Sequence, residues 1–262
     1  MIKIDAHQHF WRYNPQEYGW ITSPREALQR DFMPDDLWPL LQDIGFDGTV
    51  LVQARQTLGE TAWLLALADR YAWIRGVVGW VDLCSPDVAA QLAHFRLHPR
   101  FVGVRHLLES EPDDGYMLRP AFLRGLEALA AANLVYDLVI RARHLSTACE
   151  LAARMPTLRI VLDHIAKPDI AHGIIEPWAT ELRQLASFPH VWCKLSGMVT
   201  EADWQHWRPA DFAPYFEVVC DAFGPERLLI GSDWPVCTSA GDYRQVMGLT
   251  LDEVRRRYSA SQ

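Results

Sequence analysis

The sequence predicts an α/β protein of the (β/α)8 TIM-type barrel fold, with residues 1–262 forming a single domain. Two observations support this fold class. Short apolar runs rich in Val, Ile and Leu alternate with longer amphipathic stretches, which is typical of parallel strands that are buried on both faces and covered by helices. Eight such units lie between residues 3 and 233, which suits the number and length that a closed barrel needs.

The predicted elements alternate along the whole chain. The strands are expected at residues 3–9, 49–53, 76–82, 102–106, 134–140, 159–164, 191–196 and 228–233. The helices are expected at residues 34–44, 57–71, 87–97, 121–132, 145–155, 174–186, 214–223 and 242–258. The short stretch after the last predicted strand, which makes one helix, leaves open whether the natural C-terminus extends beyond Gln262.

A doubly wound open sheet is the competing fold class. That fold favours a glycine-rich turn after its first strand, whereas here the strand is followed by His7-Gln-His-Phe-Trp11. We therefore prefer the barrel. The connections at 10–33 and 197–212 are longer than a barrel needs and follow strands, so we expect both on the C-terminal face, where barrel active sites are built.

Composition restricts the possible partners. The net charge of −8, without long basic runs, disfavours binding to nucleic acid. The five cysteines include no C-x-x-C pair and are expected to be free thiols of a reducing compartment. The sequence has no signal-peptide pattern and no apolar stretch approaching membrane-spanning length. We therefore expect a cytoplasmic monomer or small homo-oligomer that binds neither membrane nor nucleic acid.

The strand ends carry the candidate catalytic residues. His7 and His9 are two residues apart at the end of the first strand, so their side chains are expected on one face. An isolated H-x-H pair could equally be two surface histidines. Two further apolar strands end in polar side chains, at His164 and at Asp233, and the ends of parallel strands meet at one end of a barrel. The sequence therefore predicts one site containing these four residues.

Two kinds of chemistry suit this quartet. His7, His9 and Asp233 could hold one zinc-type ion, with His164 as a fourth ligand. Alternatively, the imidazoles polarise a carbonyl while Asp233 takes a proton from water, with no cofactor required. A two-metal site would need a bridging lysine or carboxylate and further histidines, which the middle strands do not supply. At most one divalent metal is expected.

Further residues at strand ends and in loops are candidates for substrate binding. Arg105 and His106 are adjacent, so only one can face the barrel axis, and the planar guanidinium of Arg105 makes it the preferred one. Lys194 could contact a ligand or be a paired interior lysine. Asp163 precedes His164, so strand alternation points it to the opposite face as a structural partner, and Asp137 could face either way.

Tryptophans are frequent in the loops of the predicted active face. Five of the eleven lie there, and Trp11, Trp20, Trp207 and Trp234 are the candidates for substrate binding, with Trp204 beside them. Aromatic faces next to hydrogen-bonding groups suit a sugar ring. The alternative is that these side chains only anchor the loops.

Five motifs resemble the amidohydrolase superfamily, and within it the lactonase branch that includes L-fuconolactonases, L-rhamnonolactonases and pyrone-dicarboxylate lactonases. They are Asp5-Ala-His-Gln-His-Phe-Trp11, Phe101-Val-Gly-Val-Arg-His106, Leu162-Asp-His-Ile-Ala-Lys-Pro168, Lys194-Leu-Ser-Gly197 and Ile230-Gly-Ser-Asp-Trp-Pro-Val236. The resemblance extends from residue 3 to about residue 247 and implies a barrel that hydrolyses a cyclic ester. It matches His7 and His9 to the first-strand pair of the family, and His164 and Asp233 to the later histidine and aspartate.

The resemblance also narrows the expected substrate. Members of this branch often work without a catalytic metal. Because Arg105 is the one well-placed arginine and tryptophans are abundant, a neutral aldonolactone such as L-fuconolactone is favoured over a dicarboxylate, and the product would be the aldonic acid of carbohydrate metabolism. The alternatives are a metal-dependent decarboxylase of the same superfamily and a non-catalytic sugar-binding barrel.

Overall fold

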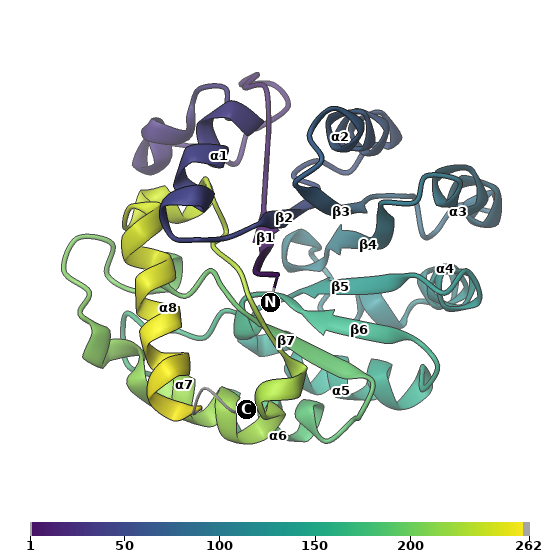
Figure 1. Ribbon diagram of the computed structural model, residues 1–262. Helices are drawn as coiled ribbons and strands as arrows, with labels where there is room; N and C mark the ends of the chain where they lie inside the picture. Colours follow the sequence, from purple (N-terminus) through teal and green to yellow (C-terminus); the bar gives the residue numbers. More distant parts are fainter. Residues whose placement is uncertain (1, 259–262) are drawn as a thin grey trace.

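The computed structural model describes residues 2–258, which form a barrel of eight parallel strands surrounded by helices (Figure 1). Each strand pairs with the next along the chain, so the predicted fold class is confirmed. The strands are β1 (Ile4–Gln8), β2 (Gly48–Val52), β3 (Ile74–Gly79), β4 (Phe101–Leu107), β5 (Val135–Val139), β6 (Arg159–Leu162), β7 (Val191–Leu195) and β8 (Leu228–Ile230). All eight overlap the predicted runs, although their bounds differ.

The barrel closes through the segment that follows β8. The backbone N–H of Asp233 donates to the carbonyl of His7 at 2.8 Å, and the N–H of His9 donates to the carbonyl of Trp234 at 2.7 Å. A parallel bridge between Gln8 and Trp234 continues this contact. Closure therefore places Asp233 directly beside the two histidines that end β1.

The helices cover the outside of the barrel. They are α1 (Pro34–Asp43), α2 (Leu58–Arg70), α3 (Val88–Arg96), α4 (Pro120–Ala131), α5 (Leu145–Arg154), α6 (Trp178–Ala186), α7 (Pro209–Phe223) and α8 (Tyr243–Arg257). Two of them start more than one residue away from the predicted position. α6 begins after Pro177, because a proline disfavours helical backbone in the residue before it. α7 begins five residues early, with Pro209 in its first turn, and accommodates Pro214 inside.

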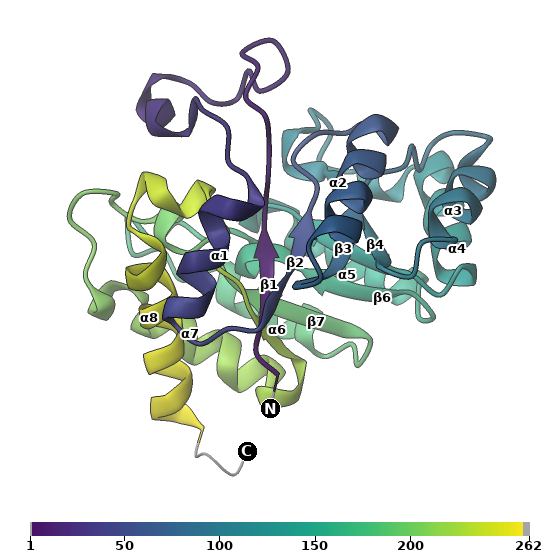
Figure 2. The same cartoon turned by 45° about the horizontal axis from the view of Figure 1, so that its top comes forward.

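Both long loops lie at the C-terminal ends of the strands. Figure 2 shows the segment after β1 rising well above the barrel before it returns to α1. Trp11 and Phe32 pair at its base through two backbone hydrogen bonds of 3.0 and 2.9 Å, and a 3-10 helix, η1 (Ser23–Leu28), lies in its outer part. The second loop contains η6 (Val199–Glu201) and ends at α7, so it is shorter than predicted.

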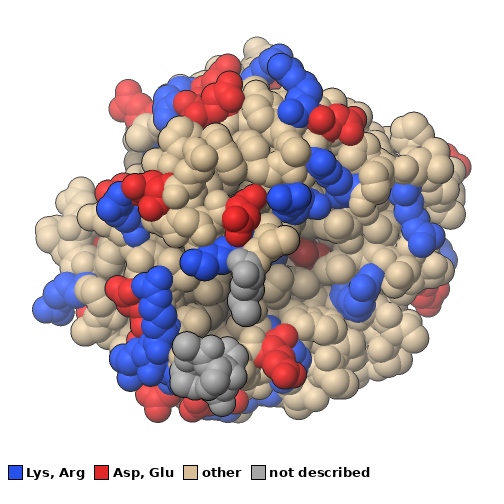
Figure 3. Space-filling view, in the orientation of Figure 1, with Lys and Arg blue, Asp and Glu red and all other residues tan. Residues whose placement is uncertain are grey.

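The outer surface carries mixed charge. On the face seen in Figure 3, acidic and basic side chains are interspersed among uncharged ones, as is usual for a solvated surface. Within residues 2–258, no helix combines the length and the apolar character needed to cross a bilayer.

Candidate active site

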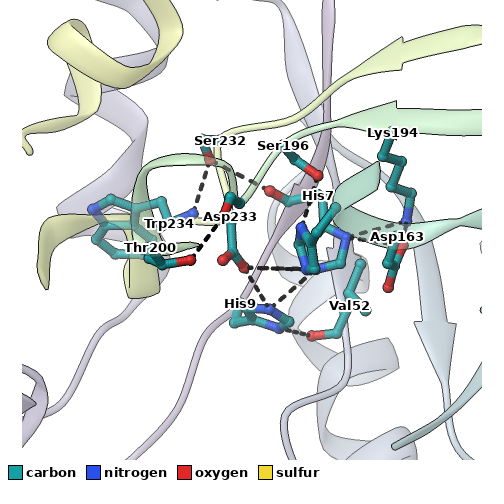
Figure 4. A network of polar contacts seen from close by, with 12 residues as sticks. His7, His9, Val52, Asp163, Lys194, Ser196, Thr200, Ser232, Asp233 and Trp234 are labelled. Atoms are coloured by element: carbon teal, nitrogen blue, oxygen red, sulfur yellow. Dashed lines mark hydrogen bonds and ion pairs between the residues drawn. The ribbon is translucent and has the colours of Figure 1, made fainter. Parts of the chain in front are cut away.

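The four predicted catalytic residues converge at the C-terminal end of the barrel. Figure 4 shows three of them, His7, His9 and Asp233, close together. The Nε2 atoms of His7 and His9 are 3.2 Å apart. Asp233 Oδ1 lies 3.3 Å from His9 Nε2, 3.7 Å from His7 Nε2 and 3.8 Å from His164 Nε2. All four side chains are buried. One carboxylate oxygen is thus surrounded by three imidazoles.

An unusual backbone turn delivers His164 to this group. His164, Ile165, Ala166 and Lys167 all have left-handed φ values, between 48° and 62°, and so does Asp233 at 58°. Non-glycine residues adopt this conformation at a cost of about 1–3 kcal/mol each, and such strain is concentrated at functional sites. The turn is accommodated by Gly197, where a Cβ atom would lie 2.5 Å from His164 Nδ1.

The same turn corrects the expectation for Asp163. Strand alternation predicts that Asp163 and His164 point to opposite faces, but β6 ends at Leu162, and alternation does not apply to the left-handed turn. Asp163 faces the barrel interior because it follows by two residues Val161, which pairs with Asp137 on the interior side of the sheet. The left-handed turn brings His164 to the same side. The Asp163 carboxylate lies 3.4 Å from His7 Nδ1 and accepts a hydrogen bond from Arg105 Nη1 at 3.1 Å.

A buried charge network lies beneath the histidines. The Lys194 ammonium contacts Asp137 Oδ2, Asp163 Oδ1 at 3.0 Å and His7 Nδ1 at 3.2 Å. Lys194 and Asp137 are both about 2% exposed, so Lys194 is a paired interior lysine, the second of the two alternatives for this residue. Asp137, left open by the sequence, faces the interior. The sequence shows Lys194 and Asp137 as polar residues within apolar strands, but it does not show that they pair with each other.

The hydrogen-bond partners restrict the imidazole protons. His9 Nδ1 lies 2.8 Å from the carbonyl of Val52, which only accepts, so neutral His9 carries its proton there and leaves a lone pair on Nε2. His7 can hold its proton on either nitrogen. Lys194 favours a lone pair on His7 Nδ1, whereas Asp163 favours a proton on the same atom.

Burial sets the charge state of the quartet. It lowers the pKa of His7 and of His9, and it lowers the pKa of His164 to about 4, so all three imidazoles are neutral at pH 7. Burial alone would raise the pKa of Asp233, but the imidazoles of His164, His9 and His7 hold it well below the usual range. The site therefore combines an ionised carboxylate with three neutral imidazoles.

This donor set fits one zinc-type ion. The ligating atoms of His7, His164 and Asp233 all lie within 4.8 Å of one another, and His9 Nε2 directs a free lone pair at the same region. Neutral imidazoles and a carboxylate are typical zinc ligands. His7, Asp137 and Asp163 are also close enough together to hold a cation, but the Lys194 ammonium already contacts all three.

Asp5 was not among the predicted site residues, although it supports the site. Its buried carboxylate accepts hydrogen bonds from the Ser232 N–H at 2.9 Å, the Ser232 hydroxyl at 2.6 Å and the Tyr243 hydroxyl at 3.0 Å. Burial raises the pKa of Asp5 to about 6. Asp5 thus fixes the turn that presents Asp233. Asp5 lies two residues before His7 on β1, so strand alternation indicates that both side chains face the same side.

A pocket of about 270 Å³ opens above the quartet. His9, His164, Asp233 and Arg105 line its floor, and Trp11 and Trp20 line the part formed by the loop after β1. Five charged residues of its wall are not among the predicted site residues: Arg25, Glu109, Arg141, Lys167 and Glu201. Lys167 lies in one of the five motifs, whereas the other four lie in loops and turns without a recognisable pattern.

Four predicted substrate-binding residues do not line this pocket. His106 faces the outside of the barrel, donates to Glu111 at 2.7 Å and stacks on Tyr116, so Arg105 is the member of the pair that faces the pocket. The indole N–H of Trp207 donates to the carbonyl of Ala240 at 2.7 Å, and Trp207 lies at a groove beside α7 and α8.

The third is Trp234, which packs in the core against Phe10 and Phe32 and does not line the pocket. Trp207 and Trp234 thus anchor their loops, which is the alternative that the sequence left open for the loop tryptophans. Lys194 lies below the pocket floor and does not line it either.

The fold and the site together define the class of the protein as a (β/α)8-barrel hydrolase. Its site combines a carboxylate and three imidazoles at the C-terminal ends of the strands. The amidohydrolase family profile matches residues 4–258, and the chain belongs to this family. The predicted superfamily resemblance is confirmed.

Proteins of known name are similar over most of the chain. An L-fucono-1,5-lactonase of Burkholderia ambifaria is 43% identical over 92% of this chain and 83% of its own length. An L-fucono-1,5-lactonase of Burkholderia multivorans is 41% identical over 100% of this chain and 91% of its own length. A crystal structure of a Burkholderia multivorans amidohydrolase with bound zinc has a TM-score of 0.93 and 41% identity, covering 100% of this chain and 94% of that one.

Proposed function

We propose that this protein hydrolyses a sugar lactone, an aldonolactone of the L-fucono-1,5-lactone type, to the aldonic acid. The observation that carries the proposal is the ionised Asp233 carboxylate on the floor of a pocket of about 270 Å³, together with the neutral imidazoles of His9 and His164. The third neutral imidazole, that of His7, is fully buried and lies 3.7 Å from Asp233 without lining the pocket. The names of the relatives at 43% and 41% identity support the same reaction. Pockets of this size suit a small ring compound.

The reaction begins with attack of water on the lactone carbonyl. Asp233 accepts the proton from water as the new C–O bond forms, and the carbonyl oxygen becomes an oxyanion. His7 and His164 can donate or polarise at this position, whereas neutral His9 presents a lone pair on Nε2 and can only accept. Arg105 adds fixed positive charge, since its Nη1 lies 3.2 Å from His7 Nε2. The tetrahedral intermediate then collapses, the ring C–O bond breaks, and the departing alkoxide takes the proton from Asp233.

We further propose that one divalent metal can bind here but is not required. His7, His9, His164 and Asp233 would hold it, and when bound it would act as a Lewis acid at the carbonyl. A similar amidohydrolase with bound zinc supports the capacity to bind. The positive charge of Arg105 and Lys194 next to His7 supports turnover without the ion.

A panel of lactones tests the proposal. Acid release from fucono-, rhamnono-, galactono- and arabinono-lactones is followed with a pH indicator, and carbon dioxide is measured in parallel with hydroxybenzoates as substrates. We expect acid release from at least one sugar lactone and no carbon dioxide. Carbon dioxide release without lactone opening would instead support a decarboxylase, and binding of sugar without turnover would support a sugar-binding barrel.

A further inference from the structure

The pocket wall contains one cation that differs from the others. Four basic side chains line the pocket, and three of them have carboxylate partners. Arg105 pairs with Asp163 at 3.1 Å, Lys167 with Glu109 at 2.7 Å, and Arg141 with Glu109 at 3.5 Å. The fourth, Arg25, makes no ion pair and no side-chain hydrogen bond within residues 2–258, and its Nε is buried without an acceptor.

Two tryptophans hold the Arg25 guanidinium in place. Its Cζ lies 5.6 Å from the ring centre of Trp20, which belongs to the same loop, and 5.3 Å from that of Trp204, in the loop after β7. Cation–π contacts of this kind fix a guanidinium without using its N–H donors. Arg25 therefore joins the two loops over the pocket while its donors remain available to a ligand.

The acidic part of the wall lies close by. Glu201, on η6 in the same loop as Trp204, also lines the pocket, and Arg141 Nη1 lies 3.6 Å from its carboxylate. Trp204, which contacts the Arg25 guanidinium, follows Glu201 by three residues, and Arg25 and Glu201 line the same pocket, so Arg25 is near Glu201 without forming an ion pair. The wall thus offers unused donors beside a carboxylate acceptor.

A sugar hydroxyl matches this pair better than a carboxylate does. A hydroxyl both accepts and donates, so one group can accept from Arg25 and donate to Glu201, whereas a carboxylate only accepts and would face two glutamates. We propose that Arg25, with Glu201, selects the substrate by binding ring hydroxyls remote from the reacting carbonyl. The inference rests on the proposed lactonase function, which places the carbonyl at Asp233 on the floor, whereas Arg25 comes from the loop above.

Two lactones separate this role from a structural one. A 1,5-aldonolactone carries the ring hydroxyls, and δ-valerolactone has the same ring without them. Replacing Arg25→Met should reduce kcat/KM for the aldonolactone roughly 10- to 100-fold, as expected for lost hydrogen bonds to a charged group, mainly through KM. For δ-valerolactone we expect less than about a twofold change. Equal losses with both lactones would overturn the proposal.

Matched variants sharpen the test. Arg30→Met removes an arginine of the same loop that stacks on Phe32 at 3.8 Å but does not line the pocket, and it should leave both rates unchanged. If Arg25 and Glu201 bind the same hydroxyl, the losses of Arg25→Met and Glu201→Gln should be less than additive in the double variant. Full additivity would contradict a shared hydroxyl.

A binding measurement keeps the inference separate from the hydrolysis. A 1,5-anhydroalditol has the ring hydroxyls but no carbonyl, and its binding can be followed by tryptophan fluorescence. We expect binding to the wild-type protein and at least a roughly tenfold weaker affinity in Arg25→Met. This result would stand even if no lactone were opened, in which case only the proposed function would fail. Equal affinities, or no binding to the wild type, would refute the role of Arg25.

Discussion

Removing Lys194 is the most direct test of the buried charge network. Lys194→Met keeps a side chain of similar length but removes the ammonium that contacts Asp137, Asp163 and His7. Asp163 retains Arg105 at 3.1 Å, whereas Asp137 loses its cation and remains buried. Leaving one buried charge uncompensated costs about 3–5 kcal/mol. At about 2–4 °C per kcal/mol for a domain of this size, the unfolding temperature should fall by about 6–20 °C.

The pH dependence of this loss distinguishes charge from packing. Burial raises the pKa of Asp137 to about 6, even though Lys194 acts to lower it, so without Lys194 the pKa is higher still. In the folded variant the Asp137 carboxyl then keeps its proton at a pH at which the unfolded chain has lost it, because the carboxyl pKa of the unfolded chain is near 3.9. Below the raised pKa the carboxyl is neutral, so the deficit relative to wild type should shrink as the pH falls from 8 to 5.

Thermal unfolding followed by circular dichroism at pH 5 and pH 8 measures both effects. The control is Arg119→Met, which removes a solvent-exposed ion pair with Asp113 and should change the unfolding temperature little at either pH. A deficit in Lys194→Met that is equal at the two pH values would show that lost packing, not an uncompensated carboxylate, destabilises the variant. A change as small as that of the control would refute the reasoning.

Four further predictions concern activity. Asp233→Asn should lower kcat by ~10²–10⁴ with little change in KM, and near wild-type turnover would remove Asp233 as the general base. Trp20→Ala should raise KM for the lactone more than it lowers kcat, whereas Trp207→Ala, outside the pocket, should leave KM unchanged. Because the pKa of His164 is about 4, kcat/KM should stay level from pH 8 to about pH 5 and fall as the pH drops through about 4; a midpoint near 6.5 would contradict this. Prolonged chelation should remove bound metal without abolishing turnover, and activity that falls with metal content and returns with Zn²⁺ would show the metal to be required.

The sequence could predict the barrel because its signals are local and repeated. Each strand is a compact apolar run and each helix an amphipathic one, so errors at single boundaries leave the order of elements unchanged. The meeting of His7, His9, His164 and Asp233 follows from the same topology, because parallel strands bring their ends together whatever their separation along the chain.

What the sequence could not predict depends on backbone that departs from regular geometry. Alternation holds in β4, where Arg105 faces inward and His106 outward, but it fails for His164 at the left-handed turn. The role of a loop tryptophan depends on contacts that no pattern encodes, so Trp207 and the pocket-lining Trp20 look alike in sequence. Arg25 lies in the same irregular loop as Trp20 and was missed for the same reason.

The charges of the site explain how one quartet can serve either metal or proton chemistry. Asp137, Asp163 and Asp233 contribute three negative charges, while Lys194 and Arg105 contribute two positive ones, so the buried group carries a net charge of −1 when its imidazoles are neutral. Such a charge is costly to bury alone and is offset by one added cation. A divalent ion can supply it, and so can the proton that leaves the attacking water. The net negative charge that favours binding of a zinc ion therefore also favours transfer of a proton to Asp233 when no zinc ion is bound.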